Sequence, residues 1–219
     1  MVSALGGDTW LSVRNIDSHG RTAAFFQGNP TEQVTEFFHI HIPLDRDRFE
    51  LTRKRDIIQI FTPTTGVEIT YKGRQYLPQE RIDTFMRARN HSVESIARVW
   101  MKDPSILVFS NGSVTVGRRQ ADSVRIIRGD DNVTLDLDVH THLPLRCSYT
   151  WRDLKYRDLN QETEEFDNYQ LVDGIQTPFS FTRYHNGDMV DQRYLYSVDY
   201  NVDLPADLFD PANTPIPAS

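Results

Sequence analysis

The sequence predicts an α+β fold that consists mostly of antiparallel β-strands, with two short helices near the middle of the chain. Apolar and polar residues alternate in segment after segment, as in Val133–Val139. A period of two places one set of side chains on a core face and the other in water. Turn sequences such as Ser110-Asn111-Gly112 separate these segments. Only residues 79–101 follow the 3.6-residue period of a helix instead.

The alternating segments occur along most of the chain. Apolar residues take the odd positions in Val67–Tyr71 and in Val133–Val139, and Tyr194, Tyr196, Val198 and Tyr200 repeat this pattern. A sheet with one face in water is typically antiparallel. Turn signals between the segments therefore predict a meander of hairpins with roughly ten strands. The helices are expected to lie on one face of this curved sheet.

Two helices are predicted between the halves of the meander. The first covers about Gln79–Arg89, where Ile82, Phe85 and Met86 share a face. The second covers Ser92–Met101, with Ser92 as its N-cap and Asp103-Pro104 after its end. Its apolar face is expected to hold Val93, Ile96, Ala97, Trp100 and Met101.

Composition indicates one globular domain spanning residues 1–219. Apolar residues make up 38% of the 219 residues and charged residues 25%, with no linker between the segments. The net charge is −7, and the basic clusters Arg53–Arg55 and Arg118–Arg119 have aspartates close by. We interpret them as solvated turns, so no nucleic-acid partner is expected. No apolar run approaches the ~20 residues of a membrane-spanning helix.

The best candidate metal ligands stand at even positions of one predicted strand: Asp136, Asp138, His140 and His142. Alternate residues lie ~6.6 Å apart along a strand, so these four could not share one ion. We interpret them as the polar outer face of that strand. His39 and His41 alternate with apolar residues in the same way and receive the same interpretation. The sequence therefore predicts no bound metal, and it carries no cofactor motif.

No short catalytic motif is present in the sequence. The acidic segment Asp158–Asp167 could supply carboxylates to a hydrolase, but it is interpreted as a solvated loop and strand edge. The single cysteine, Cys147, lies in a predicted strand and is expected to be a buried, inert thiol. The tail Pro205–Ser219 is expected to be a surface strap or a frayed end.

Aromatic residues make up 11% of the chain and are concentrated in its C-terminal third. Such residues fill the core of a strand-rich protein. They can also line a cavity for an apolar ligand. Both interpretations remain open, and they are compatible in a half-open barrel.

The order of these parts resembles the bacterial outer-membrane lipoprotein-sorting family (LolA/LolB-like). Gly66–Gly73 looks like the strand before the family's central helices, and Val139–Arg146 looks like its strand-and-proline segment. Tyr169–Phe181 resembles a family hairpin that contains Asp-Gly-Ile and a proline. Val198–Phe209 resembles its final strand and the turn that follows. The likeness covers most of the chain and depends on the order of these motifs.

This resemblance implies a curved, incompletely closed β-barrel of about eleven strands, with short helices plugging the concave face over an apolar cavity. It also implies a periplasmic carrier or sensor of a hydrophobic small molecule or acyl chain, without covalent chemistry. A membrane-bound partner protein is a further expectation. The helices would form a lid over the cavity, with ligand-binding side chains Ile82, Phe85, Met86, Val93, Ile96, Trp100 and Met101.

Two other functions remain open at this stage. A hydrolytic enzyme in the same cup would use His140 and His142 or the acidic segment as its catalytic groups. A structural or interaction module would have a filled core in place of the cavity. Met1 stands abruptly before Val2–Gly7, as on a mature N-terminus, so an exported protein whose leader is missing is expected. A cytoplasmic protein is the alternative.

Overall fold

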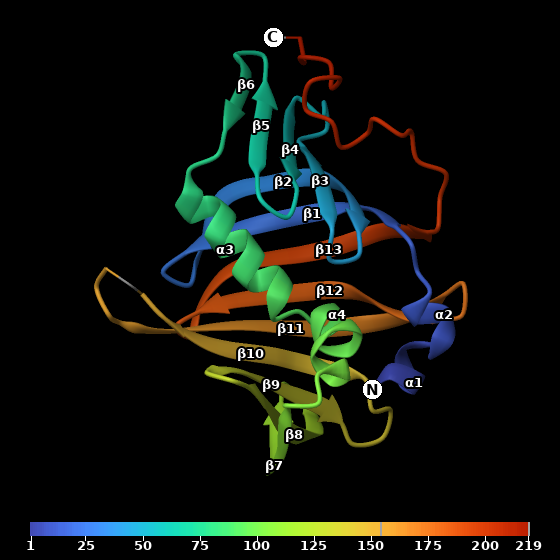
Figure 1. Cartoon of the computed structure of the whole chain (residues 1–219), viewed down its shortest axis with the longest axis vertical. Coiled ribbons are helices and arrows are strands. Elements are labelled where there is room, and N and C mark those ends of the chain that lie inside the picture. Colours follow the sequence, from blue (N-terminus) through green and yellow to red (C-terminus); the bar gives the residue numbers. More distant parts are fainter. Residues whose placement is uncertain (154, 219) are drawn as a thin grey trace. The chain divides into compact units, whose positions relative to one another are not determined.

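The strands form one mostly antiparallel sheet. The computed structural model describes residues 1–153 and 155–218, with only the backbone at residue 32. Within this part of the chain, thirteen strands follow the order β6-β5-β4-β3-β2-β1-β13-β12-β11-β10-β9-β8-β7 (Figure 1). Strands β6 and β7 are the two edges, so the sheet order does not close on itself. None of the helices described is long and apolar enough to cross a membrane.

The elements confirm the predicted class, a β-meander interrupted by helices. The strand count is two more than the eleven that the family resemblance implies. The helices are α1 (Val2–Leu5), α2 (Asp8–Leu11), α3 (Gln79–Asn90), α4 (Val93–Arg98) and the 3₁₀ turn η1 (Trp100–Lys102). The strands are β1 (Ile16–Phe26), β2 (Asn29–Ile42), β3 (Arg46–Leu51), β4 (Ile57–Phe61), β5 (Gly66–Thr70), β6 (Gly73–Tyr76), β7 (Leu107–Val116), β8 (Arg119–Arg128), β9 (Asp131–Asp138), β10 (Pro144–Arg152), β11 (Leu159–Val172), β12 (Ile175–His185) and β13 (Asp188–Tyr200).

Turn chemistry explains how consecutive strands return on themselves. Only Asp173 and Gly174 separate β11 from β12, and both have positive φ values of 50° and 81°. A two-residue hairpin whose central residues both have positive φ is a type I′ turn, and its twist matches that of the strands. The Asp-Gly pair that contributes to the family resemblance therefore sets the register of the hairpin.

The contacts divide the chain into two units, which are described separately. Unit 1 comprises residues 1–11, 23–33 and 91–193, and unit 2 comprises 12–22, 34–90 and 194–219. Each unit has a hydrophobic cluster of its own. The prediction of a single domain stays a prediction.

In unit 1, helix α4 packs into the core. Ile96 and Trp100 are both fully buried and share a cluster with Ile126, Val133 and Leu135. Burial of Val133 and Leu135 agrees with the alternation predicted for this strand, whereas burial of Asp136 and Asp138 does not. An apolar side chain that is fully removed from water contributes ~1.5–3 kcal/mol to folding. This cluster is therefore a main source of the stability of unit 1.

The second helix is shorter than predicted. Ser92 caps α4 as expected, because its hydroxyl accepts a hydrogen bond from the Ser95 N–H at 3.1 Å. The helix nevertheless ends at Arg98, and Val99 (φ −120°, ψ −60°) leads into the 3₁₀ turn η1. Because the 3.6-residue period stops there, Met101 does not share the face of Trp100, and its side chain is exposed. The prediction of one helical face through Met101 is wrong.

In unit 2, the C-terminal segment covers one face of the strands. Phe209 is buried in a cluster with Ile58, Ile60, Val67 and Ile69. This segment is held by guanidinium groups. Arg74 donates hydrogen bonds to the carbonyls of Pro211, Ala212 and Thr214. Arg48 donates a hydrogen bond to the carbonyl of Leu208. The described part of the tail is therefore a strap with a buried residue and not a frayed end.

The buried indole of Trp100 generates a stability prediction. Trp100→Ala should lower the free energy of unfolding by ~3–5 kcal/mol, because it leaves a cavity in the unit 1 cluster. Met101→Ala removes the exposed side chain of the next residue and should change the free energy of unfolding by less than ~0.5 kcal/mol. Urea unfolding followed by circular dichroism measures both values. Equal losses of stability for the two variants would contradict the burial of Trp100 in the unit 1 cluster.

Candidate functional site

Helix α3 presents its apolar side to strands of unit 2. Ile82 is buried, and Phe85 and Met86 are half-buried. The Phe85 ring stacks on Phe61 with 3.9 Å between ring centroids, and it meets Phe49 edge-on at 6.1 Å. The structure thus brings together the three side chains that the sequence predicts for the first helix of a lid. Their part in ligand binding stays a prediction.

The predicted side chains of the second helix lie in unit 1 and differ in exposure. Ile96 and Trp100 are fully buried, Val93 packs against the same cluster, and Met101 is exposed. Arg128 places its guanidinium 4.3 Å from the centroid of the Trp100 indole, which is a cation–π contact. Ile96 and Trp100 are therefore core residues in this conformation, and a ligand would reach them only if the cluster opened.

A buried polar cluster lies beside Phe85. The Asp47 carboxylate on β3 accepts hydrogen bonds at its Oδ1 atom from His39 Nε2 and His41 Nδ1, both at 2.7 Å. Its Oδ2 atom accepts from Arg89 Nη2 at 2.6 Å, and Arg89 also donates to the Asp45 carbonyl. The side chains of Asp47 and Arg89 are each only 5% exposed. This cluster ties the end of α3 to β2 and β3.

Strand geometry explains how the cluster forms. His39 and His41 alternate on β2 and so share a face, and Asp47 is the β3 residue directly opposite His41. Ile40 and Ile42, on the other face of β2, pack against the Phe209 cluster. The prediction that the two histidines lie on a solvent face is wrong, because both side chains are mostly buried and bond to Asp47. The sequence signal that was missed is the hairpin register, which pairs Asp47 with His41.

The ionised form of Asp47 is stabilised by these neighbours. Burial alone would raise its pKa by disfavouring the charged carboxylate. The hydrogen bonds from His39 and His41 outweigh this effect, so the pKa of Asp47 lies well below its usual range. Asp47 is thus a carboxylate that accepts hydrogen bonds at both oxygens.

The strand predicted to carry Asp136, Asp138, His140 and His142 ends earlier than expected. Strand β9 stops at Asp138, and both histidines lie in the connection to β10, where His142 has φ 58°. Asp136 and Asp138 are buried, which contradicts a polar outer face. Asp136 pairs with Arg146 at 2.6 Å, and Asp138 accepts the backbone N–H groups of His140 and Thr141. The two aspartates therefore fix the strand pairing and the turn.

Backbone donors also shift the ionisation of Asp138. The N–H of Thr141 makes the largest contribution and lowers the pKa of Asp138, while burial works against it. A carboxylate that accepts two backbone N–H bonds is a common way to close a turn. Asp138 therefore closes this turn, a structural role that the sequence pattern did not reveal.

The acidic segment forms β11, which is an inner strand of the sheet order and not a loop or an edge. Its carboxylates have partners within unit 1. Glu162 accepts from His185 Nδ1 at 2.7 Å, and Glu164 pairs with Arg193. Glu165 accepts a hydrogen bond from the Tyr184 hydroxyl. Burial raises the pKa of Tyr184, and the negative charge of Glu165 raises it further. These three carboxylates therefore have hydrogen-bond or ion-pair partners within the sheet.

Cys147 is buried, as predicted. Its thiol donates a hydrogen bond to the His91 carbonyl at 3.2 Å, and burial raises the pKa of the Cys147 thiol far above its usual range. Because the thiolate is the nucleophile, a thiol with a raised pKa is unreactive. Its surroundings are those of a core residue.

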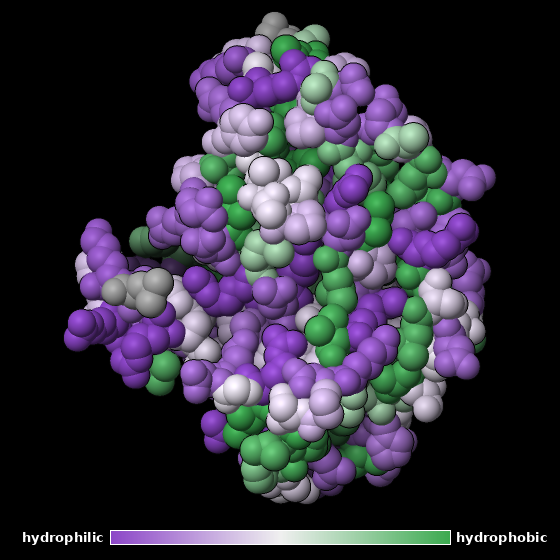
Figure 2. Space-filling view, in the orientation of Figure 1, coloured by the Kyte–Doolittle hydropathy of each residue, from purple (hydrophilic) through white to green (hydrophobic). Residues whose placement is uncertain are grey.

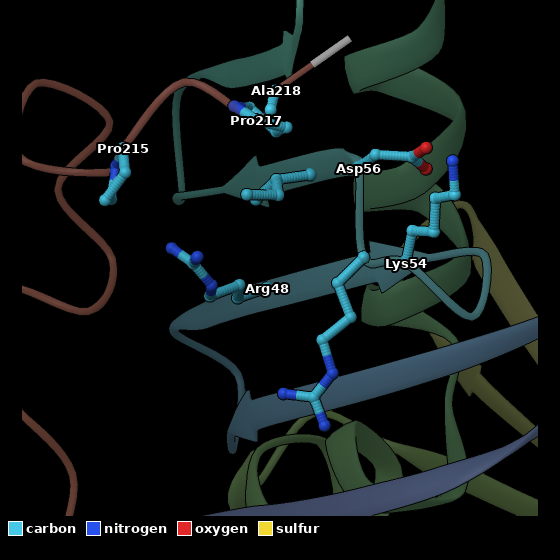
Figure 3. Close-up of a pocket in the computed structure, with 8 residues that line it drawn as sticks. Arg48, Lys54, Asp56, Pro215, Pro217 and Ala218 are labelled. Carbon is cyan, nitrogen blue, oxygen red and sulfur yellow. The ribbon is translucent and has the colours of Figure 1, made fainter.

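One pocket lies within unit 2, between the C-terminal segment and the β3–β4 connection. It has a volume of about 470 Å³. Its lining includes the charged residues Arg48, Lys54 and Asp56 and the tail residues Pro215, Pro217 and Ala218, all labelled in Figure 3. Arg48 already pairs with Glu50 at 2.7 Å. Four of its eight lining residues are charged, so this pocket does not have the lining that an acyl chain requires.

Comparison with known proteins bears on the fold. No family model matches the sequence, and no curated protein matches it. The solved structures with a similar fold include three that match nearly the whole chain. One is described as an outer membrane lipoprotein-sorting protein domain from Vibrio parahaemolyticus, with 10% identity, 90% of this chain and 89% of that chain covered, and a TM-score of 0.54. The chain has a LolA-like fold.

The other two structures agree with this assignment. A LolA superfamily protein from Nitrosomonas europaea has 12% identity, covers 89% of this chain and 88% of its own, and has a TM-score of 0.54. A DUF1329 family protein from Desulfovibrio piger has 12% identity, coverages of 93% and 92%, and a TM-score of 0.55. The resemblance found in the sequence is thereby confirmed at the level of the LolA-like fold.

The Asp47 cluster generates a second stability prediction. Asp47→Asn should lower the free energy of unfolding by ~3–5 kcal/mol, because it leaves the buried Arg89 guanidinium without its counter-charge. Asp167→Asn is the matched control, since it removes an exposed carboxylate that pairs with Arg119. This control should cost no more than ~1 kcal/mol. Chemical denaturation measures both, and a small loss for Asp47→Asn would show that the cluster does not stabilise unit 2.

Proposed function

We propose that the protein is a periplasmic carrier or sensor that binds a hydrophobic, acyl or lipid-like ligand without covalent chemistry. The observation that carries this proposal is the LolA-like fold over about nine-tenths of the chain. The Vibrio structure of this fold is described as a lipoprotein-sorting domain. A protein that sorts lipoproteins has to accommodate acyl chains, and the same chemistry would suit an apolar surface here.

The ligand would contact the apolar side of α3, and the proposed residues there are Ile82, Phe85 and Met86. Phe85 offers an aromatic face, and Met86 is unbranched and adapts to irregular apolar partners. In unit 1 the proposed contacts are Val93, Ile96, Trp100 and Met101. Hydrophilic side chains dominate the face shown in Figure 2, with apolar ones in separate patches. This face therefore offers no single broad apolar surface to a ligand.

A structural or interaction module is the second candidate. The full burial of Ile96 and Trp100 favours it, because these side chains already have protein partners. The two functions make different demands on the unit 1 cluster that contains Ile96 and Trp100. A carrier has to open part of its apolar interior at low cost, whereas a module with a filled core does not.

Ligand binding can be tested directly. The protein, expressed with export and purified without detergent, should yield a lipid on solvent extraction and mass spectrometry. It should also bind a fluorescent fatty acid. Phe85→Ala should weaken probe binding about tenfold, since ~1.4 kcal/mol of lost apolar contact corresponds to that factor. Phe26→Ala is the matched control, because it removes an exposed phenyl ring.

Three results would count against the carrier. They are the absence of any extracted lipid, a probe that does not bind, and equal affinities for Phe85→Ala and Phe26→Ala. A Trp100→Ala variant that loses the full core stability and leaves probe binding unchanged would favour the structural module. These outcomes separate a ligand surface from a filled core.

We also propose that the mature protein acts in the periplasm and delivers its ligand to, or receives it from, a membrane-bound partner protein. The LolA-like fold supports this location. The native gene, fused in frame with its own upstream sequence to an alkaline phosphatase reporter, should give active phosphatase, which folds only after export. The same fusion without the upstream sequence should be inactive. An inactive native fusion, or a gene without a hydrophobic leader, would contradict export.

A further inference from the structure

Two imidazoles and one carboxylate converge at a single point of unit 2. His39 and His41 from β2 and Asp47 from β3 each offer one ligand atom, and these three atoms all lie within 4.8 Å of one another. His39 Nε2 and His41 Nδ1 are both 2.7 Å from Asp47 Oδ1. The sequence pattern predicted no bound metal, because His39 and His41 alternate with apolar residues and were expected to lie in solvent.

From this convergence we propose that His39, His41 and Asp47 form a binding site for a divalent transition metal of the zinc class. Two imidazole nitrogens and one carboxylate oxygen are a donor set typical of zinc sites with three protein ligands, in which the fourth position is left to water or an exogenous ligand. The ion would bind the two ring nitrogens that now face Asp47 Oδ1, and any proton on these nitrogens would have to leave them.

The surroundings satisfy what such a site needs beyond its ligands. Arg89 holds the Oδ2 atom of Asp47 at 2.6 Å, which fixes the carboxylate and leaves Oδ1 for the ion. The His39 ring stacks on Phe49 with 4.0 Å between centroids, so its plane is fixed too. Outer contacts that orient ligands in this way commonly strengthen metal binding. The His39 and His41 side chains remain 20% and 15% exposed, so an ion can approach.

The charge of Arg89 sets an upper limit on the affinity. Its guanidinium neutralises Asp47, so the three ligands attract a dication less strongly than a set with an unpaired carboxylate. We therefore expect weaker binding than in a closed four-ligand structural site. The ion would add to the stability of a cluster that is already held together by hydrogen bonds.

The test uses untagged protein that has been treated with a chelator and then dialysed. Saturating Zn²⁺ should raise the Tm of the wild-type protein by about 5 °C, because an ion that binds only the folded state stabilises it. The double variant His39→Gln/His41→Gln should lose this rise. The double variant His140→Gln/His142→Gln is the matched control, because it removes the other His-x-His pair, and it should keep the full rise.

Cobalt gives a second measurement that needs no variant. Co²⁺ bound by two imidazoles and a carboxylate in four-coordinate geometry should give visible absorption bands, and Zn²⁺ should displace it with a stoichiometry of one. Wild-type protein that shows neither a Tm rise nor these bands would overturn the proposal. So would a rise that disappears in the His140→Gln/His142→Gln variant, since that would place the ion on the exposed pair.

Discussion

The charge of Asp47 is the interaction on which the arrangement of unit 2 depends. A carboxylate that is almost fully buried has to be compensated, and here three cationic or polar groups from β2 and α3 provide the compensation. The arrangement is costly to break from either side, because removing one partner leaves the other charge buried. Helix α3 is thereby tied to the sheet by Arg89 at its C-terminal end and by the Phe85 ring in its middle. Apolar contact alone would allow the helix to slide, whereas the ion pair fixes its position.

Much of the fold was accessible from the sequence because it depends on local patterns. The two-residue alternation predicted β9, the Asp-Gly turn predicted the β11–β12 hairpin, and Ser92 was correctly placed as the cap of α4. What failed depended on pairing between strands. His39 and His41 were placed in solvent because alternation alone cannot show that both faces of a strand are covered. Met101 was misplaced because the change from α-helix to 3₁₀ turn at Val99 has no clear local signal.

Arginine has a role in this protein that composition alone did not reveal. Of the 24 basic residues, 20 are arginine. Several of these side chains donate to backbone carbonyls at the ends of elements. Arg98 reaches the carbonyls of Trp10 and Leu11 at the end of α2, and Arg74 reaches three carbonyls of the C-terminal strap. A guanidinium has five donors in a planar fork and can satisfy several carbonyls at once, which a lysine ammonium does less well.

The edge strand β7 has a consequence for the behaviour of the protein in concentrated solution. Leu107, Val108 and Phe109 are exposed on it, at one end of the sheet order, where unpaired backbone groups can recruit a strand from another molecule. Its pairing with β8 shifts register between Ser110 and Gly112, and Gly112 has φ +82°. Such a bulge bends a strand and makes a flat, continuous edge impossible. Gly112 thus bends the exposed edge of β7, which works against the addition of a strand from another molecule.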